Sequence, residues 1–115
     1  ENLQVVRYET GQQYKPHYDF FVPGSNGTEE ALKRGGQRHA TLFVYLNDLE
    51  KHDTGGETHF PELDLKVKPK KGTAVFWMNV TPDKNVDYRT KHAGLPPSCS
   101  TKYGCNIWIR EGKYT

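Results

Sequence analysis

The chain has 115 residues, of which 34% are hydrophobic, and its 16 basic and 14 acidic side chains leave a formal net charge of +2. This length suits a single domain with one core, and the near-balance of charge gives no electrostatic footprint for nucleic acid. No apolar run is as long as a membrane span, and two cysteines, Cys99 and Cys105, are too few for a disulfide scaffold.

Short runs of β-branched, aromatic and aliphatic residues alternate with turn-forming residues along the chain, which predicts an all-β domain. One short helix is expected at Thr28–Arg34, where Thr28 is a suitable N-cap and Gly35 follows the last turn. Eight short strands with almost no helix are typical of a jelly-roll or barrel that holds a small ligand among inward-facing side chains. In chain order the strands are expected at Leu3–Tyr8, Lys15–Phe21, Gln37–Leu46, Glu57–Phe60, Leu65–Val67, Thr73–Asn79, Arg89–Ala93 and Tyr103–Arg110.

Two of the expected strands have informative faces. In "RHATLFVYLN", residues 38–47, both faces carry apolar residues, which predicts a central strand that is packed on both sides. In the last strand, Lys102, Asn106 and Trp108 share one face. A lysine, an asparagine and a tryptophan together make an unusual outer surface, so this face is a candidate wall of a pocket.

The segment "GQQYKPHYDF", residues 11–20, places His17 and Asp19 two residues apart. Pro16 and the neighbouring aromatic residues favour an extended backbone, and residues i and i+2 of a strand lie on the same face, about 7 Å apart. An imidazole and a carboxylate on one face can chelate a metal, form an acid–base pair or play no chemical role. By itself this spacing is a weak signal.

The chain has five histidines, and three of them, His39, His52 and His59, are interpreted as surface residues or as residues behind a site. His92 differs because it lies in the strand-like segment "YRTKHAG", late in the chain. Lys102 follows it by ten residues. His92 is therefore the best candidate to join the first pair.

Together, His17, Asp19 and His92 supply two imidazoles and one carboxylate. That set matches the facial triad of non-haem Fe(II) oxygenases, and it also suits a catalytic zinc ion. Lys102 favours iron, because a buried cation needs an anionic partner and a dicarboxylate cosubstrate bound to the metal would supply one.

Five blocks of the sequence resemble, in the same order, the prolyl 4-hydroxylase family of Fe(II)- and 2-oxoglutarate-dependent dioxygenases. They are "VVRYETGQQYKPHYDFF", "GGQRHATLFVYLND", "GGETHFPE", "VKPKKGTAVFW" and "TKHAGLPPSCSTKYGCNIWIREG". The resemblance implies a double-stranded β-helix core of the jelly-roll, cupin-like type, in one catalytic domain over residues 1–115. It also implies hydroxylation of peptidyl proline at C4 in a proline-rich peptide or protein, with O2 consumed, succinate and CO2 released, and ascorbate as the reductant.

The resemblance assigns roles to the candidate residues of the metal set. It implies that His17, Asp19 and His92 bind Fe(II). It implies that Lys102 pairs with the distal carboxylate of 2-oxoglutarate.

Five further positions match the family's pattern. Tyr8 and Thr41 occupy positions whose hydroxyls help to hold the cosubstrate, and Trp108 lines the same pocket. Tyr14 and Arg38 match positions associated with the peptide groove.

The chain departs from the family at two points. Many members have a cysteine soon after the distal histidine, in "HxxCP", where this chain has "HAGLPPSC". We therefore expect Cys99 and Cys105 to be reduced thiols or to form a dispensable bridge. The amino-terminal helices that usually buttress the sheet are expected to be missing. The long connection Val22–Gly36 is expected to be a mobile lid over the peptide groove.

Two alternative functions remain open at this point. One is the same cofactor chemistry on a free amino acid or on another protein side chain. The other is a catalytically silent jelly-roll binding module, which would be expected to lose a metal ligand or the lysine. The resemblance implies the lumen of the endoplasmic reticulum for a eukaryotic member, and the sequence leaves the oligomeric state open.

Overall fold

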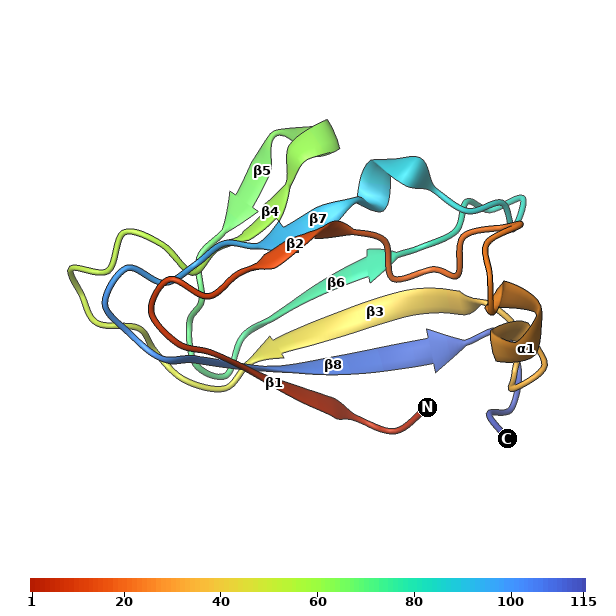
Figure 1. Cartoon of the computed structure of the whole chain (residues 1–115), viewed down its shortest axis with the longest axis horizontal. Coiled ribbons are helices and arrows are strands. Elements are labelled where there is room, and N and C mark those ends of the chain that lie inside the picture. The colour runs from red at the N-terminus through yellow and green to blue at the C-terminus, as the bar shows by residue number, and fades with distance from the viewer.

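The computed structural model describes all 115 residues, which form two four-stranded antiparallel sheets that face each other as a jelly-roll (Figure 1). The expected fold class is confirmed. In the first sheet the strand order is β1-β8-β3-β6, with β1 at Gln4–Tyr8, β8 at Lys102–Arg110, β3 at Arg38–Tyr45 and β6 at Ala74–Met78. In the second sheet the order is β2-β7-β4-β5, with β2 at Tyr14–His17, β7 at His92–Gly94, β4 at Thr58–Phe60 and β5 at Leu65–Val67.

Helical structure is confined to three short elements, α1 (Thr28–Leu32), η1 (Pro61–Leu63) and η2 (Tyr88–Thr90). The α1 helix begins after Gly27, which has a φ of 81°, so Thr28 is its first residue and not its N-cap. The Thr28 hydroxyl instead donates to the Val22 carbonyl oxygen at 2.7 Å. None of these helices has the length and apolar character needed to cross a bilayer.

The η2 turn occupies part of the stretch that was expected to be a strand from Arg89. The Asp87 carboxylate accepts a hydrogen bond from the Arg89 backbone N–H, which caps a 3-10 turn and delays the strand until His92. Such side-chain bonds to the backbone compete with sheet pairing.

The first sheet packs only its inner face within this chain. Along β3, Thr41, Phe43 and Tyr45 are buried between the sheets, as expected. The outer face stays open, because neighbouring outward residues such as Phe76 of β6 and Ile109 of β8 are exposed. The prediction that both faces are covered therefore holds only in part for this chain, since on the outer face of β3 Ala40 is buried but Leu42 and Val44 are only half-buried.

The segment 22–36 is tied down at its carboxyl end. The Arg110 guanidinium donates to the carbonyl oxygens of Ala31 and Gly36 at 3.0 and 2.9 Å, and the Gly112 N–H donates to Gly35 at 2.8 Å. In Figure 1, α1 accordingly lies beside the carboxyl-terminal end of the chain. The carboxyl end of this segment is therefore anchored, so any lid motion of the kind expected from the sequence would be confined to the rest of the segment.

Both cysteines are free thiols. Cys105 is buried in β8, and Cys99 is exposed in the loop that precedes this strand.

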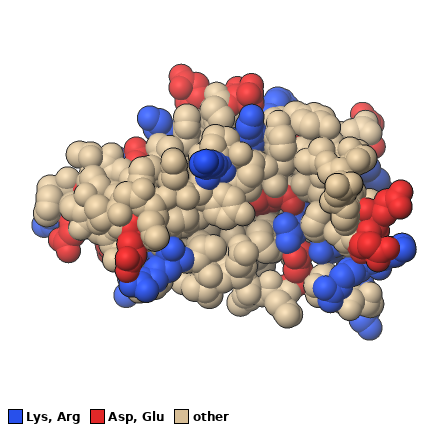
Figure 2. All heavy atoms as spheres, viewed as in Figure 1, with Lys and Arg blue, Asp and Glu red and all other residues tan.

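Charged side chains of both signs are interspersed over the face shown in Figure 2, with much uncharged surface between them.

Candidate active site

The end of β2 brings the first two candidate ligands together. His17 is the last residue of the strand, and Asp19 lies in a bend directly after it, so the single strand expected through residue 21 is not formed. The pairing of β2 with β7 shifts register after Tyr14 and then places His17 opposite His92. The third candidate therefore comes from the neighbouring strand, with its ring centroid 4.3 Å from that of His17.

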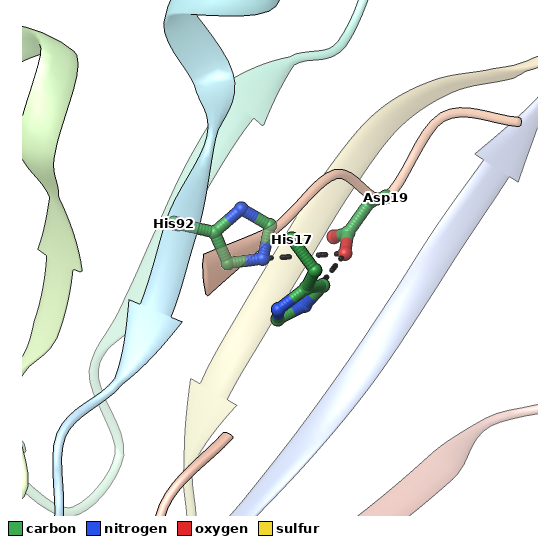
Figure 3. A group of neighbouring side chains, drawn as sticks. All are labelled: His17, Asp19 and His92. Carbon is green, nitrogen blue, oxygen red and sulfur yellow. Dashed lines mark ion pairs between the residues drawn. The ribbon is translucent and has the colours of Figure 1, made fainter. Parts of the chain in front are cut away.

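The three side chains converge on one point (Figure 3). Asp19 Oδ1 lies 3.5 Å from His17 Nε2 and 3.2 Å from His92 Nε2. One ligand atom from each residue lies within 4.8 Å of the others. Two imidazoles and a carboxylate in this arrangement are able to hold a divalent metal ion on one side.

Backbone carbonyls orient both imidazoles. His17 Nδ1 lies 2.7 Å from the Lys15 carbonyl oxygen, and His92 Nδ1 lies 2.8 Å from that of Thr90. Because a carbonyl only accepts, Nδ1 carries the proton in each ring and the Nε2 lone pair is left for the metal.

The second carboxylate oxygen of Asp19 is held by the protein. Thr41 Oγ1 donates to Asp19 Oδ2 at 2.8 Å, and Trp108 Nε1 donates to the same oxygen at 3.2 Å. Burial alone would raise the pKa of Asp19, but the two imidazoles of His17 and His92 beside Oδ1 and the hydrogen bond from Thr41 outweigh it and hold the pKa well below its usual range. Asp19 is therefore ionised at neutral pH, as a carboxylate must be to bind a metal ion.

A cavity of about 180 Å³ opens beside the cluster, between the two sheets. One water needs roughly 10–15 Å³, so this space suits a small organic molecule. Its walls are formed by Gln4, Tyr8, Tyr14, His17, Tyr18, Asp19, Arg38, Phe43, Thr58, Trp77, His92, Ala93, Gly94, Lys102, Asn106 and Trp108.

Lys102 begins β8 and places a positive charge in this cavity while being only 1% exposed. Its Nζ lies 5.2, 5.5 and 5.7 Å from the ring centroids of Tyr8, Phe43 and Tyr45, and no carboxylate forms an ion pair with it. Burial lowers the pKa of Lys102 from 10.5 to about 8, and the negative charge of Glu57 partly opposes this. An unpaired buried ammonium is costly, so the cavity suits an anionic ligand.

Residues 3–110 match the family model of the 2OG-Fe(II) oxygenase superfamily. The chain belongs to this superfamily. The prolyl 4-hydroxylase subunit alpha-1 of Gallus gallus is 43% identical over 113 residues, which cover 96% of this chain and 21% of that protein. The subunit alpha-1 of Homo sapiens is 42% identical over 113 residues, which cover 96% of this chain and 20% of that protein.

Solved structures agree with this membership. The crystal structure of a viral collagen prolyl hydroxylase from Paramecium Bursaria Chlorella virus-1, in its complex with 2OG, matches with a TM-score of 0.81 and 42% identity. The match covers 98% of this chain and 60% of that one. The resemblance to prolyl 4-hydroxylases is confirmed, and the chain spans about a fifth of the length of the two curated relatives named above.

In this member of the superfamily, Tyr8 lies next to Lys102 in the cavity and adds a phenol hydroxyl to the cavity wall. Burial raises the pKa of Tyr8 to about 12, with further contributions from Tyr14 and Asp19. The phenol therefore keeps its proton and is able to donate a hydrogen bond at neutral pH. A Cβ at Gly94 would lie only 3.3 Å from the Tyr8 hydroxyl, so glycine at that position leaves room for the phenol.

Tyr14 and Arg38, which were assigned to the peptide groove, both reach the cavity. The Tyr14 ring is exposed and lies 4.0 Å from the His17 ring, measured between centroids. The Arg38 guanidinium lies 3.7 Å from the Trp108 ring centroid and pairs with the Glu1 carboxylate. The positive charge of Arg38 is therefore already paired with Glu1, and its planar guanidinium lies over the Trp108 ring.

Thr41 is the one assigned residue that does not line the cavity. Its hydroxyl was expected on the cosubstrate, but in the structure it donates to Asp19 and accepts from Asn79. The hydroxyl is therefore engaged by Asp19, a candidate metal ligand, and by Asn79. The physical reason is full burial at the centre of β3, out of reach of the cavity.

Sequence reasoning missed two residues of the cavity wall that carry clear structural roles. Thr58 faces the cavity from β4, and its hydroxyl lies 2.7 Å from that of Tyr45. The Trp77 ring packs at 4.8 Å from the His92 ring centroid. Both residues lie in the family-like blocks "GGETHFPE" and "VKPKKGTAVFW", which was the available signal.

Proposed function

We propose that this chain is the catalytic domain of an Fe(II)- and 2-oxoglutarate-dependent dioxygenase that hydroxylates peptidyl proline at C4, releasing succinate and CO2. One observation carries the proposal: a buried, unpaired Lys102 faces the same cavity as a cluster of two histidines and an aspartate. A ligand that is anionic at one end and metal-binding at the other satisfies both features. 2-Oxoglutarate has that chemistry.

The donor set fits Fe(II). It consists of two imidazole Nε2 atoms and one oxygen of an ionised carboxylate, which is the facial set of non-haem iron oxygenases. The same three groups would also fit zinc, and the buried cation is the feature that favours the oxygenase. When bound, the iron and 2-oxoglutarate supply the activation of O2 for C–H hydroxylation, with ascorbate as the proposed reductant.

The residues of the chain provide binding, orientation and exclusion of water. Lys102 balances the distal carboxylate of the cosubstrate, and the hydroxyls of Tyr8 and Thr58 lie in the wall near this lysine. The rings of Tyr8, Phe43 and Tyr45 surround the Lys102 ammonium and keep this end of the cavity apolar, which strengthens the attraction between the ammonium and the carboxylate.

An aromatic surface beside the cavity supports a proline-rich peptide as the substrate. Tyr14 and Tyr18 line the cavity, and the exposed Tyr88 ring meets Tyr18 edge-on at 5.4 Å. The Phe20 ring, which stacks on Tyr18 at 4.6 Å, is buried and supports this surface from the core. Proline-rich peptides are preformed polyproline II helices that bind aromatic grooves at low entropic cost. This surface favours a peptide over a free amino acid.

The affinity for 2-oxoglutarate should fall above about pH 8. The ammonium form of Lys102 binds the carboxylate, and its pKa in the free protein is lowered to about 8. The charged form therefore dominates at pH 7 and is lost as the pH rises through 8, which costs about tenfold in affinity for each further pH unit. Calorimetric titration of the Mn(II)-loaded chain between about pH 6.5 and pH 9.5 measures this.

Pyruvate is the matched control ligand, since it has the keto acid but no distal carboxylate. Its affinity should not show the additional loss above pH 8. Parallel pH profiles for both ligands would contradict the role of Lys102.

The function itself is tested by succinate release with Fe(II), 2-oxoglutarate and ascorbate, in the presence and absence of a proline-rich peptide. The peptide should stimulate release and gain one oxygen atom at proline by mass spectrometry. A peptide with alanine in place of each proline is the control. Equal stimulation by the alanine peptide would favour another side chain as the target, and no turnover with any substrate would favour a silent binding module.

A further inference from the structure

A chain of buried hydrogen bonds runs behind the metal-binding cluster, from Trp77 to Asp19. Trp77 Nε1 donates to Asn79 Oδ1 at 2.7 Å, Asn79 Nδ2 donates to Thr41 Oγ1 at 2.9 Å, and Thr41 Oγ1 donates to Asp19 Oδ2 at 2.8 Å. Thr41 and Asn79 are both 0% exposed, so water does not compete with the two bonds that join Asn79 to Thr41 and Thr41 to Asp19.

The chemistry of the two ends fixes the direction of every bond. An indole N–H only donates, so it requires the oxygen of the Asn79 amide and turns the amide NH2 group towards Thr41. The Thr41 hydroxyl then accepts from Asn79 and has its single proton left for Asp19, whose ionised carboxylate only accepts. Each donor in this series of hydrogen bonds thus has one acceptor.

We propose that Asn79 is a positioning residue for the metal ligand Asp19, acting through Thr41. The series of hydrogen bonds from Trp77 through Asn79 and Thr41, hereafter the relay, holds Oδ2 of Asp19. Oδ1 alone then faces His17 Nε2 and His92 Nε2. A carboxylate held in this way offers the metal one oxygen in a fixed direction. This inference deepens the proposed function, and it depends only on the binding of a metal ion by the cluster.

A purely structural role for the Asn79 side chain is less consistent with its backbone contacts. The Asn79 N–H already donates to the His39 carbonyl oxygen at 2.7 Å, and the Asn79 carbonyl oxygen accepts from the Asp87 N–H at 2.9 Å. These two bonds hold the segment after β6 in place without the amide. The amide is therefore free to act on Thr41.

The test measures Mn(II) affinity by electron paramagnetic resonance on the metal-stripped chain. Thr41→Val keeps the shape of the side chain and removes the donor to Asp19, so affinity should fall on the order of 10- to 100-fold, as for other partners of metal ligands. Thr41→Ser keeps the hydroxyl and should bind within about threefold of the unmodified chain. Asn79→Leu should lose about three- to tenfold, since Asn79 acts through Thr41.

A double variant separates a relay from two independent effects. In the T41V background, N79L should cause almost no further loss of Mn(II) affinity, because the hydroxyl that transmits its effect is already absent. The control is Thr28→Val, which removes another buried hydroxyl, the one bound to Val22. It should lower the melting temperature and leave Mn(II) affinity unchanged.

Wild-type Mn(II) affinity in T41V and N79L would overturn the proposal, and so would two losses that multiply fully in the double variant. If T41V or N79L fails to fold, the Mn(II) affinity of the other, compared with that of the unmodified chain, decides. Trp77→Phe tests the far end of the hydrogen-bond series by the same affinity measurement, because it removes the indole N–H and keeps a ring that still packs on His92. Mn(II) binding needs no peptide substrate. A failed hydroxylation assay would therefore leave this test intact.

Discussion

Lys102→Met should weaken 2-oxoglutarate binding by at least about thirtyfold and leave the affinity for the metal unchanged. The distal carboxylate would enter a dry, aromatic end of the cavity with no positive charge to meet it. Leaving one member of a buried charge pair alone costs on the order of 2–5 kcal/mol, and about 2 kcal/mol already corresponds to roughly thirtyfold in affinity. Calorimetric titration of the Mn(II)-loaded variant with 2-oxoglutarate measures the first affinity, and titration of the metal-stripped variant with Mn(II) measures the second.

The same variant should unfold at a higher temperature than the unmodified chain. The folded-state pKa of Lys102 lies near 8, below its usual 10.5, so the folded protein binds this proton more weakly than the unfolded chain does. Stability is therefore reduced below pH 8 and recovers as the pH rises towards 10.5. A shift from 10.5 to about 8 corresponds to on the order of 3 kcal/mol, and methionine removes this cost.

Lys102→Arg is the matched control for charge. It should restore binding only in part, because a planar guanidinium does not replace a compact ammonium in a fixed pocket. An unchanged 2-oxoglutarate affinity in Lys102→Met would show that the cosubstrate binds elsewhere.

The strands of the first sheet could be predicted because local pattern decides them. Alternation of inward and outward residues in β3, β6 and β8 placed each strand within one residue of its observed bounds. The end of β2 could not be predicted in this way, since it depends on a register shift against β7. The η2 turn depends on local hydrogen bonds from Arg89 and Thr90 to Asp87, which compete with an otherwise strand-like pattern.

The candidate site was only partly accessible from the sequence. The spacing of His17 and Asp19 predicted a shared face, but the structure brings them together through a bend after the strand. Cross-strand pairing then adds His92, which is distant in sequence. The partners of Thr41 lie outside its own strand, so the sequence pattern alone did not show that its hydroxyl serves Asp19.

Removing any one of the three metal ligands should abolish metal binding and turnover while the fold survives. His17→Ala should be the best tolerated of the alanine variants, because His17 is only partly buried while Asp19 and His92 are buried. Asp19→Ala should cost more stability, because it leaves the donors of Thr41 and Trp108 unpaired in the protein interior.

Asp19→Asn is the sharpest of these variants, because it preserves shape and changes only charge and hydrogen-bonding capacity. Thr41 and Trp108 both donate to Oδ2, so they would select the oxygen of the new amide. Its NH2 group would then face the two Nε2 atoms and occupy the place of the metal ion. We expect a folded protein with a melting temperature close to that of the unmodified chain, no Mn(II) binding and no succinate release. Metal content by elemental analysis, melting by circular dichroism and the succinate assay measure the three outcomes, and full activity in any variant would remove that residue from the ligand set.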